Sequence, residues 1–401
     1  WRPRVIDETA LATLLSATHG ADAPFGQTGQ SGQAGAGGSV TPPIVQSSLF
    51  TFDSYQAFAD RMSGKTSSPI YTRVQNPTVA AFEDLMAKAE RGEAAIGFAS
   101  GMAAISSTLL AYVKPGDRIA CVEHVYPDTF RLMERLLRPF GVEVEYHPVS
   151  AFENDPELLA GVTIAYLESP SSNTFEVINL PRVTEHAKRH GAVTMIDNSW
   201  AGTLFQRPLT LGVDIVLHSA SKYISGHSDT VAGVVVSSHD HIARIRDLTV
   251  PLLGAKLAPF EAFLLTRGLR TLVARMRQHE ATANLFVDRL SVLPQVRKIR
   301  SPGPNDVPGL TGRSGLMGVE FDDSVDIPTF CDALTHFKLG VSWGGFESLV
   351  MPARIGLAQA GEQNSMQKFG VSPNLVRLNL GLEEAEDLWA DFATALAASQ
   401  R

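Results

Sequence analysis

Two side chains in the stretch from Val193 to Gly233 have the types and the placement that cofactor chemistry requires. Asp197 ends the apolar run VTMID, and Lys222 follows within the polar segment SASKYIS. An amine at a strand end can bond to the aldehyde of pyridoxal phosphate, and a nearby carboxylate can keep the pyridine nitrogen protonated. The alternative is an ordinary βαβ unit whose polar residues only cap strands. Taken alone, the two residues favour that structural alternative.

Short apolar strands alternate with amphipathic helices from Ala94 to Ser238. This alternation predicts an α/β fold with a mostly parallel sheet and helices on both faces. Ligands on such sheets lie beyond the carboxyl ends of the strands. The candidate segments there are the Ser100–Gly101–Met102 turn, Asp197, and the segment that contains Ser219, Ser221 and Lys222.

The turn at Ser100 and Gly101 closes a predicted strand and opens a predicted helix. Free N–H groups and the positive dipole end of such a helix attract an anion such as a phosphate. A serine N-cap without a ligand is an ordinary alternative, so the turn alone is a weak signal. The chain contains neither GxGxxG nor GxxxxGK[ST], which removes the usual support for binding a dinucleotide or a nucleoside triphosphate.

Tyr71 and Arg73 stand just before a predicted helix that has Asn76 as N-cap and Pro77 at its first position. A guanidinium fork and a phenol hydroxyl make a good pair of phosphate ligands. A surface salt bridge of the arginine is the alternative, and the local sequence does not choose between them.

The rest of the chain divides into an arm and a second domain. We predict an arm over residues 1–62, with a short helix over 5–18 and a flexible Gly/Gln/Ser-rich loop over 25–39. A cofactor-binding large domain is predicted over 63–257. A small α+β domain is predicted over 258–401, beginning with a long helix to about residue 292 in which Gly268 is a break or a close-packing point.

Composition excludes several classes of protein. The 401 residues are 44% hydrophobic and 19% charged, and the net charge is −8 with acids and bases interspersed. We therefore expect neither a nucleic-acid nor a membrane partner, and the large apolar fraction favours an oligomer with apolar subunit interfaces. Cys121 and Cys331 fit reduced core thiols, and His239 with His241 fits a solvated helix start better than a metal site. With no apolar signal sequence at the N-terminus, the expected location is cytoplasmic.

The chain resembles the Cys/Met-metabolism pyridoxal phosphate enzymes of fold type I, and within them the cystathionine β-lyases. The resemblance runs from about Val40 to the C-terminus, and its strength comes from the order in which many short motifs occur. These are YTRVQNPT (71–78), SGMAA (100–104), VYPDT (125–129), ESPSSN (168–173), IDNSW (196–200), SASKYISGHSD (219–229), LAPFEAFLLTRGLRTL (257–272), SWGGFESL (342–349) and LVRLNLGLE (375–383).

The resemblance implies a role for each motif residue. It makes Lys222 the residue that bonds to pyridoxal phosphate and removes the substrate Cα proton, and Asp197 the partner of the pyridine nitrogen. Tyr126 would stack on the ring, and either Tyr126 or Lys222 would protonate the leaving sulfur, a choice that the sequence does not make. Arg377, with Ser342 and Ser172, would hold the substrate carboxylate. The resemblance further implies a phosphate cup of Ser100, Gly101, Met102, Ser219 and Ser221, completed by Tyr71 and Arg73 of a neighbouring subunit in a homotetramer built as a dimer of dimers.

Departures from the family pattern bear on the reaction. Ser172 stands where many relatives have an asparagine near the cofactor hydroxyl, and Trp343 is shared with the β-lyases. Val341 stands where γ-lyase-type members typically carry a glutamate, which weakens γ-elimination. The resemblance thus predicts a carbon–sulfur β-lyase acting on cystathionine or a related cysteine S-conjugate. The alternatives are γ-elimination or γ-replacement in the same family, and a non-catalytic cofactor-binding regulator.

Overall fold

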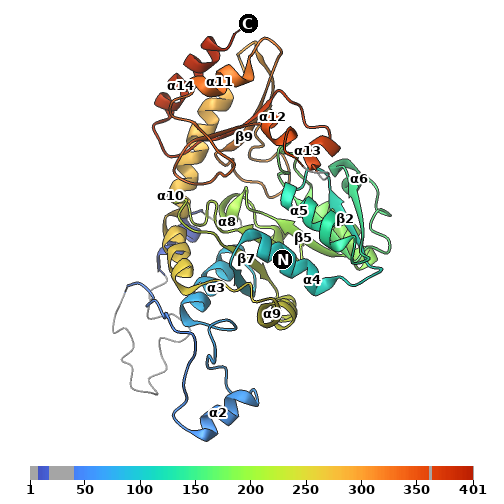
Figure 1. Cartoon of the computed structure of the whole chain (residues 1–401), viewed down its shortest axis with the longest axis vertical. Helices are drawn as coiled ribbons and strands as arrows, with labels where there is room; N and C mark the ends of the chain where they lie inside the picture. The colour runs from blue at the N-terminus through green and yellow to red at the C-terminus, as the bar shows by residue number, and fades with distance from the viewer. Residues whose placement is uncertain (1–7, 18–39, 361–363, 401) are drawn as a thin grey trace.

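The computed structural model describes residues 8–17, 40–360 and 364–400 of the chain. It contains two sheets with helices packed on them, and the long helix α10 (Pro259–Leu290) extends from one sheet region to the other (Figure 1). Within the described ranges, no helix is both long and apolar enough to cross a membrane.

The larger sheet has seven strands in the order β1-β7-β6-β5-β4-β2-β3. The strands from β6 to β3 are parallel to their neighbours, whereas β7 is antiparallel to both β1 and β6. The predicted mostly parallel α/β sheet is confirmed. Its strands are β1 (Ala94–Phe98), β2 (Arg118–Val122), β3 (Glu143–His147), β4 (Ile164–Glu168), β5 (Val193–Asp197), β6 (Ile215–Ser219) and β7 (Gly233–Ser237).

Helices cover both faces of this sheet because its central strands are apolar on both sides. On β5, Met195 packs into one buried cluster with Ile105 and Ile242, while the next residue, Ile196, packs into another with Val183. The helices of this region are α3 (Pro77–Glu90), α4 (Gly101–Tyr112), α5 (Pro127–Leu132) continued by the π-helical turn Met133–Leu137, α6 (Val149–Asn154), α7 (Leu180–His190), α8 (Gly202–Phe205), the 3-10 turn Pro208–Leu211, and α9 (His239–Leu253).

The smaller sheet has five strands in the order β10-β11-β12-β9-β8. Its edge strands were missed from the sequence, since β10 has two residues and the middle of β8 is exposed. Its strands are β8 (Val296–Arg300), β9 (Leu316–Phe321), β10 (Lys338–Leu339), β11 (Leu349–Pro352) and β12 (Leu375–Asn379). Its helices are α11 (Ile327–Ala333), α12 (Ala353–Leu357), α13 (Ser365–Lys368) and α14 (Ala385–Ala398).

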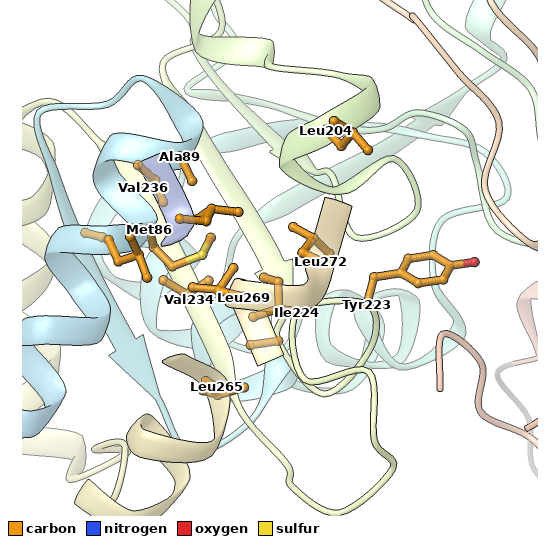
Figure 2. Packing of buried hydrophobic residues seen from close by; sticks show 14 of the residues in the cluster. Met86, Ala89, Leu204, Tyr223, Ile224, Val234, Val236, Leu265, Leu269 and Leu272 are labelled. Atoms are coloured by element: carbon orange, nitrogen blue, oxygen red, sulfur yellow. The ribbon is translucent and has the colours of Figure 1, made fainter. Parts of the chain in front are cut away.

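Helix α10 supplies residues to both cores. Leu269 lies in the cluster with α3 and β7 (Figure 2), and Phe286 lies in the cluster beneath the smaller sheet. Gly268 does not break the helix and is a close-packing point, because a Cβ there would lie 2.3 Å from the carbonyl oxygen of Ile224. A domain boundary at 257/258 remains a prediction.

The described part of the arm contains α1 (Glu8–Ala17) and α2 (Tyr55–Met62). Leu11 and Leu15 of α1 are buried in the cluster that also contains α3 and α10 residues, whereas α2 buries no side chain and projects from the rest of the molecule (Figure 1). The predicted flexible loop over 25–39 lies outside the described residues.

Several local predictions are confirmed, and one needs correction. Asn76 caps α3 with Pro77 at its first position, and both cysteines are free and buried. The correction concerns His241, which was predicted to be solvated at the start of α9. The half-buried His241 instead forms a hydrogen bond through its Nδ1 with the Tyr112 hydroxyl.

Candidate active site at the ends of the parallel strands

Lys222 follows strand β6, in the turn that leads toward β7. Its Nζ donates to the Ser342 Oγ at 2.8 Å and lies 5.2 Å from the centroid of the Trp343 ring. Burial and the charge of Arg377 lower the pKa of Lys222 to about 8, while Asp197 and Glu347 oppose that change. A lysine with this pKa is partly a free amine near neutral pH, as a nucleophile or a general base must be.

Asp197 ends β5, the neighbour of β6, so the parallel arrangement brings it to the same sheet edge as Lys222. Its Oδ1 accepts from the Ser199 N–H at 2.9 Å. Burial raises the pKa of Asp197, and the Ser199 hydrogen bonds, His218 and Lys222 act in the opposite direction. A buried carboxylate of this kind gains from a cationic ring nitrogen placed against it.

The predicted anion site lies at the N-terminus of α4, which meets the end of β6. Ser100 caps the helix by accepting from the Ala103 N–H at 3.0 Å. A Cβ on Gly101 would lie 3.0 Å from the Ser219 Oγ, so the two predicted segments touch. Met102 is the half-buried second residue of the same helix. The first N–H groups of α4 have no acceptor within the helix, which leaves them available to a phosphate.

The two serines around Lys222 differ in their contacts. The Ser219 N–H donates to the Ser199 Oγ at 2.7 Å, which ties the end of β6 to the turn after Asp197. The Ser221 hydroxyl accepts from the Ala232 N–H at 2.9 Å and donates to the Ala232 carbonyl at 3.2 Å. Ser221 thus contacts the backbone next to β7. A phosphate oxygen could replace the Ala232 carbonyl as the acceptor of the Ser221 hydroxyl, because that hydrogen bond is the longer of the two.

The segment after Val341 packs directly on the backbone of Lys222. Gly344 has a φ of 81°, and a Cβ there would lie 3.1 Å from the Lys222 Cβ. Its N–H donates to the Asn379 Oδ1 at 2.9 Å, so strand β12 fixes this approach. Glycine is required here both by the left-handed backbone and by the space.

Arg377 lies on β12, inside the smaller sheet. Its guanidinium reaches the Val341–Ser342 backbone, next to the Ser342 hydroxyl that Lys222 contacts. Its Nη2 donates to the carbonyl oxygens of Val341 and Ser342, at 2.6 and 3.4 Å. Burial lowers its pKa to about 10. Among the described residues no carboxylate lies within ion-pair distance of Arg377, so the guanidinium has donors left for an anionic ligand.

The aromatic residues lie at the margins of this group. Tyr126 is the N-cap residue just before α5, is 41% exposed, and donates its hydroxyl to the Asp128 Oδ2 at 3.1 Å. Burial of part of the ring and the Asp128 charge raise its pKa to about 12, so its hydroxyl keeps the proton. Trp343 packs on Tyr223 with the ring centroids 5.6 Å apart, and the Val341 side chain is 77% exposed.

Two predicted phosphate ligands are not brought to Lys222 within this chain. Tyr71 is exposed, and the Arg73 guanidinium lies 5.4 Å from its ring centroid. The Arg73 Nη1 donates to the carbonyl of Pro251, at 2.6 Å, in α9.

Two residues in the site were not singled out from the sequence. Glu168 ends β4 beside Asp197 and accepts the Ser172 hydroxyl at 2.5 Å. Arg275 in α10 donates to the carbonyl of Tyr223, the residue after Lys222, at 2.8 Å. The motif ESPSSN contained Glu168, but only the strand order reveals that it adjoins Asp197.

The donor set fits pyridoxal phosphate. A helix N-terminus for the phosphate, a buried carboxylate for the ring nitrogen and a partly neutral lysine lie at one sheet edge. The predicted residues Lys222, Asp197, Ser100 and Gly101 thus come together.

Three comparisons with known proteins agree with this arrangement. The L-methionine γ-lyase of Pseudomonas putida is 35% identical over 377 residues, covering 90% of this chain and 94% of the relative. A cystathionine β-lyase of Lactococcus lactis subsp. cremoris (strain MG1363) is 33% identical, with the same coverage of 90% and 94%. The crystal structure of a cystathionine γ-synthase from Xanthomonas oryzae pv. oryzae superposes with a TM-score of 0.85 at 31% identity, covering 97% of this chain and 98% of the other.

The family is also recognised directly from the sequence. A sequence profile described as Cys/Met metabolism PLP-dependent enzyme matches residues 26–397. The profile match and the relatives agree on a pyridoxal phosphate-dependent enzyme of fold type I, which removes support from a non-catalytic regulator. The chain belongs to the Cys/Met metabolism PLP-dependent enzyme family.

Proposed function

We propose that this enzyme is a carbon–sulfur β-lyase that cleaves cystathionine, or a related cysteine S-conjugate, to a thiol such as homocysteine, pyruvate and ammonia. Pyridoxal phosphate, when bound, supplies a ring that accepts the electron pair left at the substrate Cα. Asp197 would keep that ring protonated through a charge-assisted hydrogen bond. Its position beside β6 supports this role.

Lys222 is the proposed base for the Cα proton. Its pKa of about 8 leaves enough free amine near neutral pH for proton transfer. The Ser342 hydroxyl and the Trp343 ring hold the amine in place. Tyr126, whose N–H is hydrogen-bonded to Glu168 at the end of β4, would lie against the ring of the bound cofactor.

Arg377 is the proposed ligand of the substrate carboxylate. The guanidinium can form a two-pronged contact with a carboxylate, and Ser342 and Ser172 supply hydroxyls nearby. Its half-buried position, with no carboxylate of the described residues within ion-pair distance, supports this role. The carboxylate contact orients the Cα–H bond toward Lys222.

The thiolate leaves with the electron pair of the broken Cβ–S bond and needs a proton. Lys222 holds the proton it removed from Cα, and its ammonium is a stronger acid than the Tyr126 phenol, whose pKa is about 12. We therefore assign Lys222 as the donor. Water then converts the remaining three-carbon fragment to pyruvate and ammonia, which balances the reaction.

Val341 is the residue that we propose favours cleavage of the Cβ–S bond over cleavage of the Cγ–S bond. γ-Elimination also requires proton transfer at Cβ, and Val341 offers no ionisable side chain where γ-lyase-type members typically carry a glutamate. The second candidate is γ-elimination or γ-replacement. It has support from the L-methionine γ-lyase of Pseudomonas putida, which is 35% identical to this chain.

Product analysis distinguishes the two candidates. Incubated with cystathionine, the enzyme should release pyruvate and homocysteine, identified by chromatography of the derivatised keto acid and thiol. Release of 2-oxobutyrate and cysteine instead would assign the enzyme to γ chemistry. The variant Val341→Glu tests the reason for the choice and should raise the share of 2-oxobutyrate, whereas Val341→Gln has a similar size and should not.

We further propose a homotetramer in which each active site takes Tyr71 and Arg73 from a neighbour. Large apolar side chains of the arm and of the α9–α10 region are exposed in the single chain, which supports burial in an assembly. They include Tyr55 at 88%, Met62 at 65% and Leu252 at 75%. Buried free cysteines fit the cytoplasmic location that belongs to the same proposal.

Mixing two inactive variants tests the shared sites. Lys222→Ala and Arg73→Ala should each have little activity alone. After co-expression, random pairing should restore about a quarter of wild-type activity, because half of the dimers carry one intact site of two. A mixture that stays as inactive as its components would contradict a site shared between subunits.

A further inference from the structure

Glu168 is a buried acid that the proposed mechanism does not use. It is the last residue of β4, is 7% exposed, and pairs in register with Asp197 of the adjacent parallel strand β5. Two carboxyl groups therefore lie side by side at the sheet edge where the cofactor is proposed to bind. Glu168 is buried and Asp197 is half-buried. Two negative charges at such neighbouring positions repel each other, so one group has a reason to keep its proton.

Both carboxyl oxygens of Glu168 have partners in segments that face the site. Its Oε2 accepts from the backbone N–H of Tyr126 at 2.8 Å, in the turn after β2. Its Oε1 lies 2.5 Å from the Ser172 Oγ, in the loop after β4. One side chain thus ties together the residue proposed to cover the cofactor ring and the serine that replaces the family's asparagine.

The surroundings of the two acids differ. Asp197 has Lys222 and His218 near it and accepts hydrogen bonds from Ser199. Burial and the Asp197 charge raise the pKa of Glu168 to about 8, and the hydrogen bonds from Ser172 and Tyr126 only partly offset this.

The other titratable groups around Glu168 are Cys121, Tyr126 and Tyr166. Burial raises the pKa of each of these groups, so they remain neutral near pH 7. None of them supplies a positive charge that could stabilise an ionised Glu168. Of the two acids at this edge, Asp197 is the one placed to carry the negative charge.

We propose that Glu168 is a positioning residue that works as a neutral carboxylic acid. Its Oε2 accepts from the Tyr126 N–H, and protonation reverses the contact with Ser172, so that the Oε1–H donates to the Ser172 Oγ. It thereby fixes both segments over the cofactor while Asp197 keeps the only negative charge of the pair. The proposal rests on the proposed function, since it takes Asp197 as the partner of the ring nitrogen. Glutamine has the same shape as the neutral acid and the same donor and acceptor.

The test compares Glu168→Gln, Glu168→Ala and the control Glu176→Gln, an exposed acid in the loop after β4. Measurements are the dissociation constant of pyridoxal phosphate, the circular dichroism of its absorption band, and thermal unfolding of the apoprotein. Glu168→Gln should stay within about threefold of wild type. Glu168→Ala leaves a buried N–H without an acceptor and should weaken cofactor binding about tenfold or more and alter the dichroism.

The pH dependence separates positioning from a general effect on folding. As pH rises through about 8, wild type should ionise Glu168 and lose cofactor affinity, while Glu168→Gln should not. Lys222 titrates in both proteins, so the difference between their curves reports Glu168. This comparison still decides if Glu168→Ala fails to fold.

Two results would overturn the proposal: cofactor binding by Glu168→Ala as tight as by Glu176→Gln, or a Glu168→Gln variant as impaired as Glu168→Ala. Failure of the proposed β-lyase function is seen separately. It would appear as 2-oxobutyrate released from cystathionine by the wild-type enzyme, which leaves the cofactor measurements on Glu168 interpretable.

Discussion

Replacing Lys222 with alanine should lower kcat on cystathionine by at least about 10³-fold, because the variant loses both the covalent attachment of the cofactor and the base for the Cα proton. Lys222→Arg should be similarly inactive, since a guanidinium keeps its proton near neutral pH. The measurement is steady-state keto-acid release with saturating pyridoxal phosphate. The exposed Lys338 in β10 supplies the control, and Lys338→Ala should retain wild-type activity.

The lowered pKa of Lys222 adds a pH dependence to this prediction. Below about pH 8 most of the lysine is protonated, and only the remaining free-amine fraction can attack an aldehyde. The rate of cofactor attachment to the apoprotein should therefore rise with pH and level off above about pH 8. Substantial turnover by Lys222→Ala, or attachment that does not depend on pH in this range, would contradict the assignment.

Removing the Arg377 guanidinium should raise the KM for cystathionine by about 100-fold, since it removes a buried charged partner of the substrate carboxylate. Arg377→Lys should recover only part of the affinity, because an ammonium cannot form the planar two-pronged contact. Arg297 forms an exposed ion pair with Asp323, and Arg297→Ala serves as the control. For the Arg377 variants we expect a large increase in KM and a smaller change in kcat.

The same variant tests which end of the substrate Arg377 contacts. Amines that lack the α-carboxylate compete with cystathionine in an inhibition assay. Wild type should bind them far more weakly than the corresponding amino acids, and Arg377→Ala should bind the two kinds about equally. A variant that still prefers the carboxylate would show that another residue holds it.

The larger sheet was predictable because its strands are apolar runs separated by amphipathic helices. Strand β5 reads VTMID and β6 reads IVLHS, and both faces of each are covered. The antiparallel direction of β7 was not predictable, because the run GVVVS has the same pattern in either direction. Strand β8 was missed since VRKIR carries charges on an exposed edge.

The sequence placed Asp197 and Lys222 at the ends of neighbouring strands, and the structure brings the two strand ends to one sheet edge. Arg377 was identified only through the family resemblance, and the roles of all three residues stay predictions. The place of Glu168 was not predictable, because a glutamate at a strand end has the same local pattern whether it faces water or another acid. Only the adjacency of β4 and β5 places it next to Asp197. The need for glycine at position 344 was likewise not predictable, because the Lys222 backbone that it contacts is far away in the sequence.

Every role proposed above requires that pyridoxal phosphate bind at the sheet edge around Lys222. The most direct measurement is borohydride reduction of the cofactor-loaded enzyme, followed by mass spectrometry of its peptides. We predict a pyridoxyl phosphate mass on the peptide that contains Lys222 and on no other peptide. A label on a different lysine, or no label on any peptide, would contradict the account.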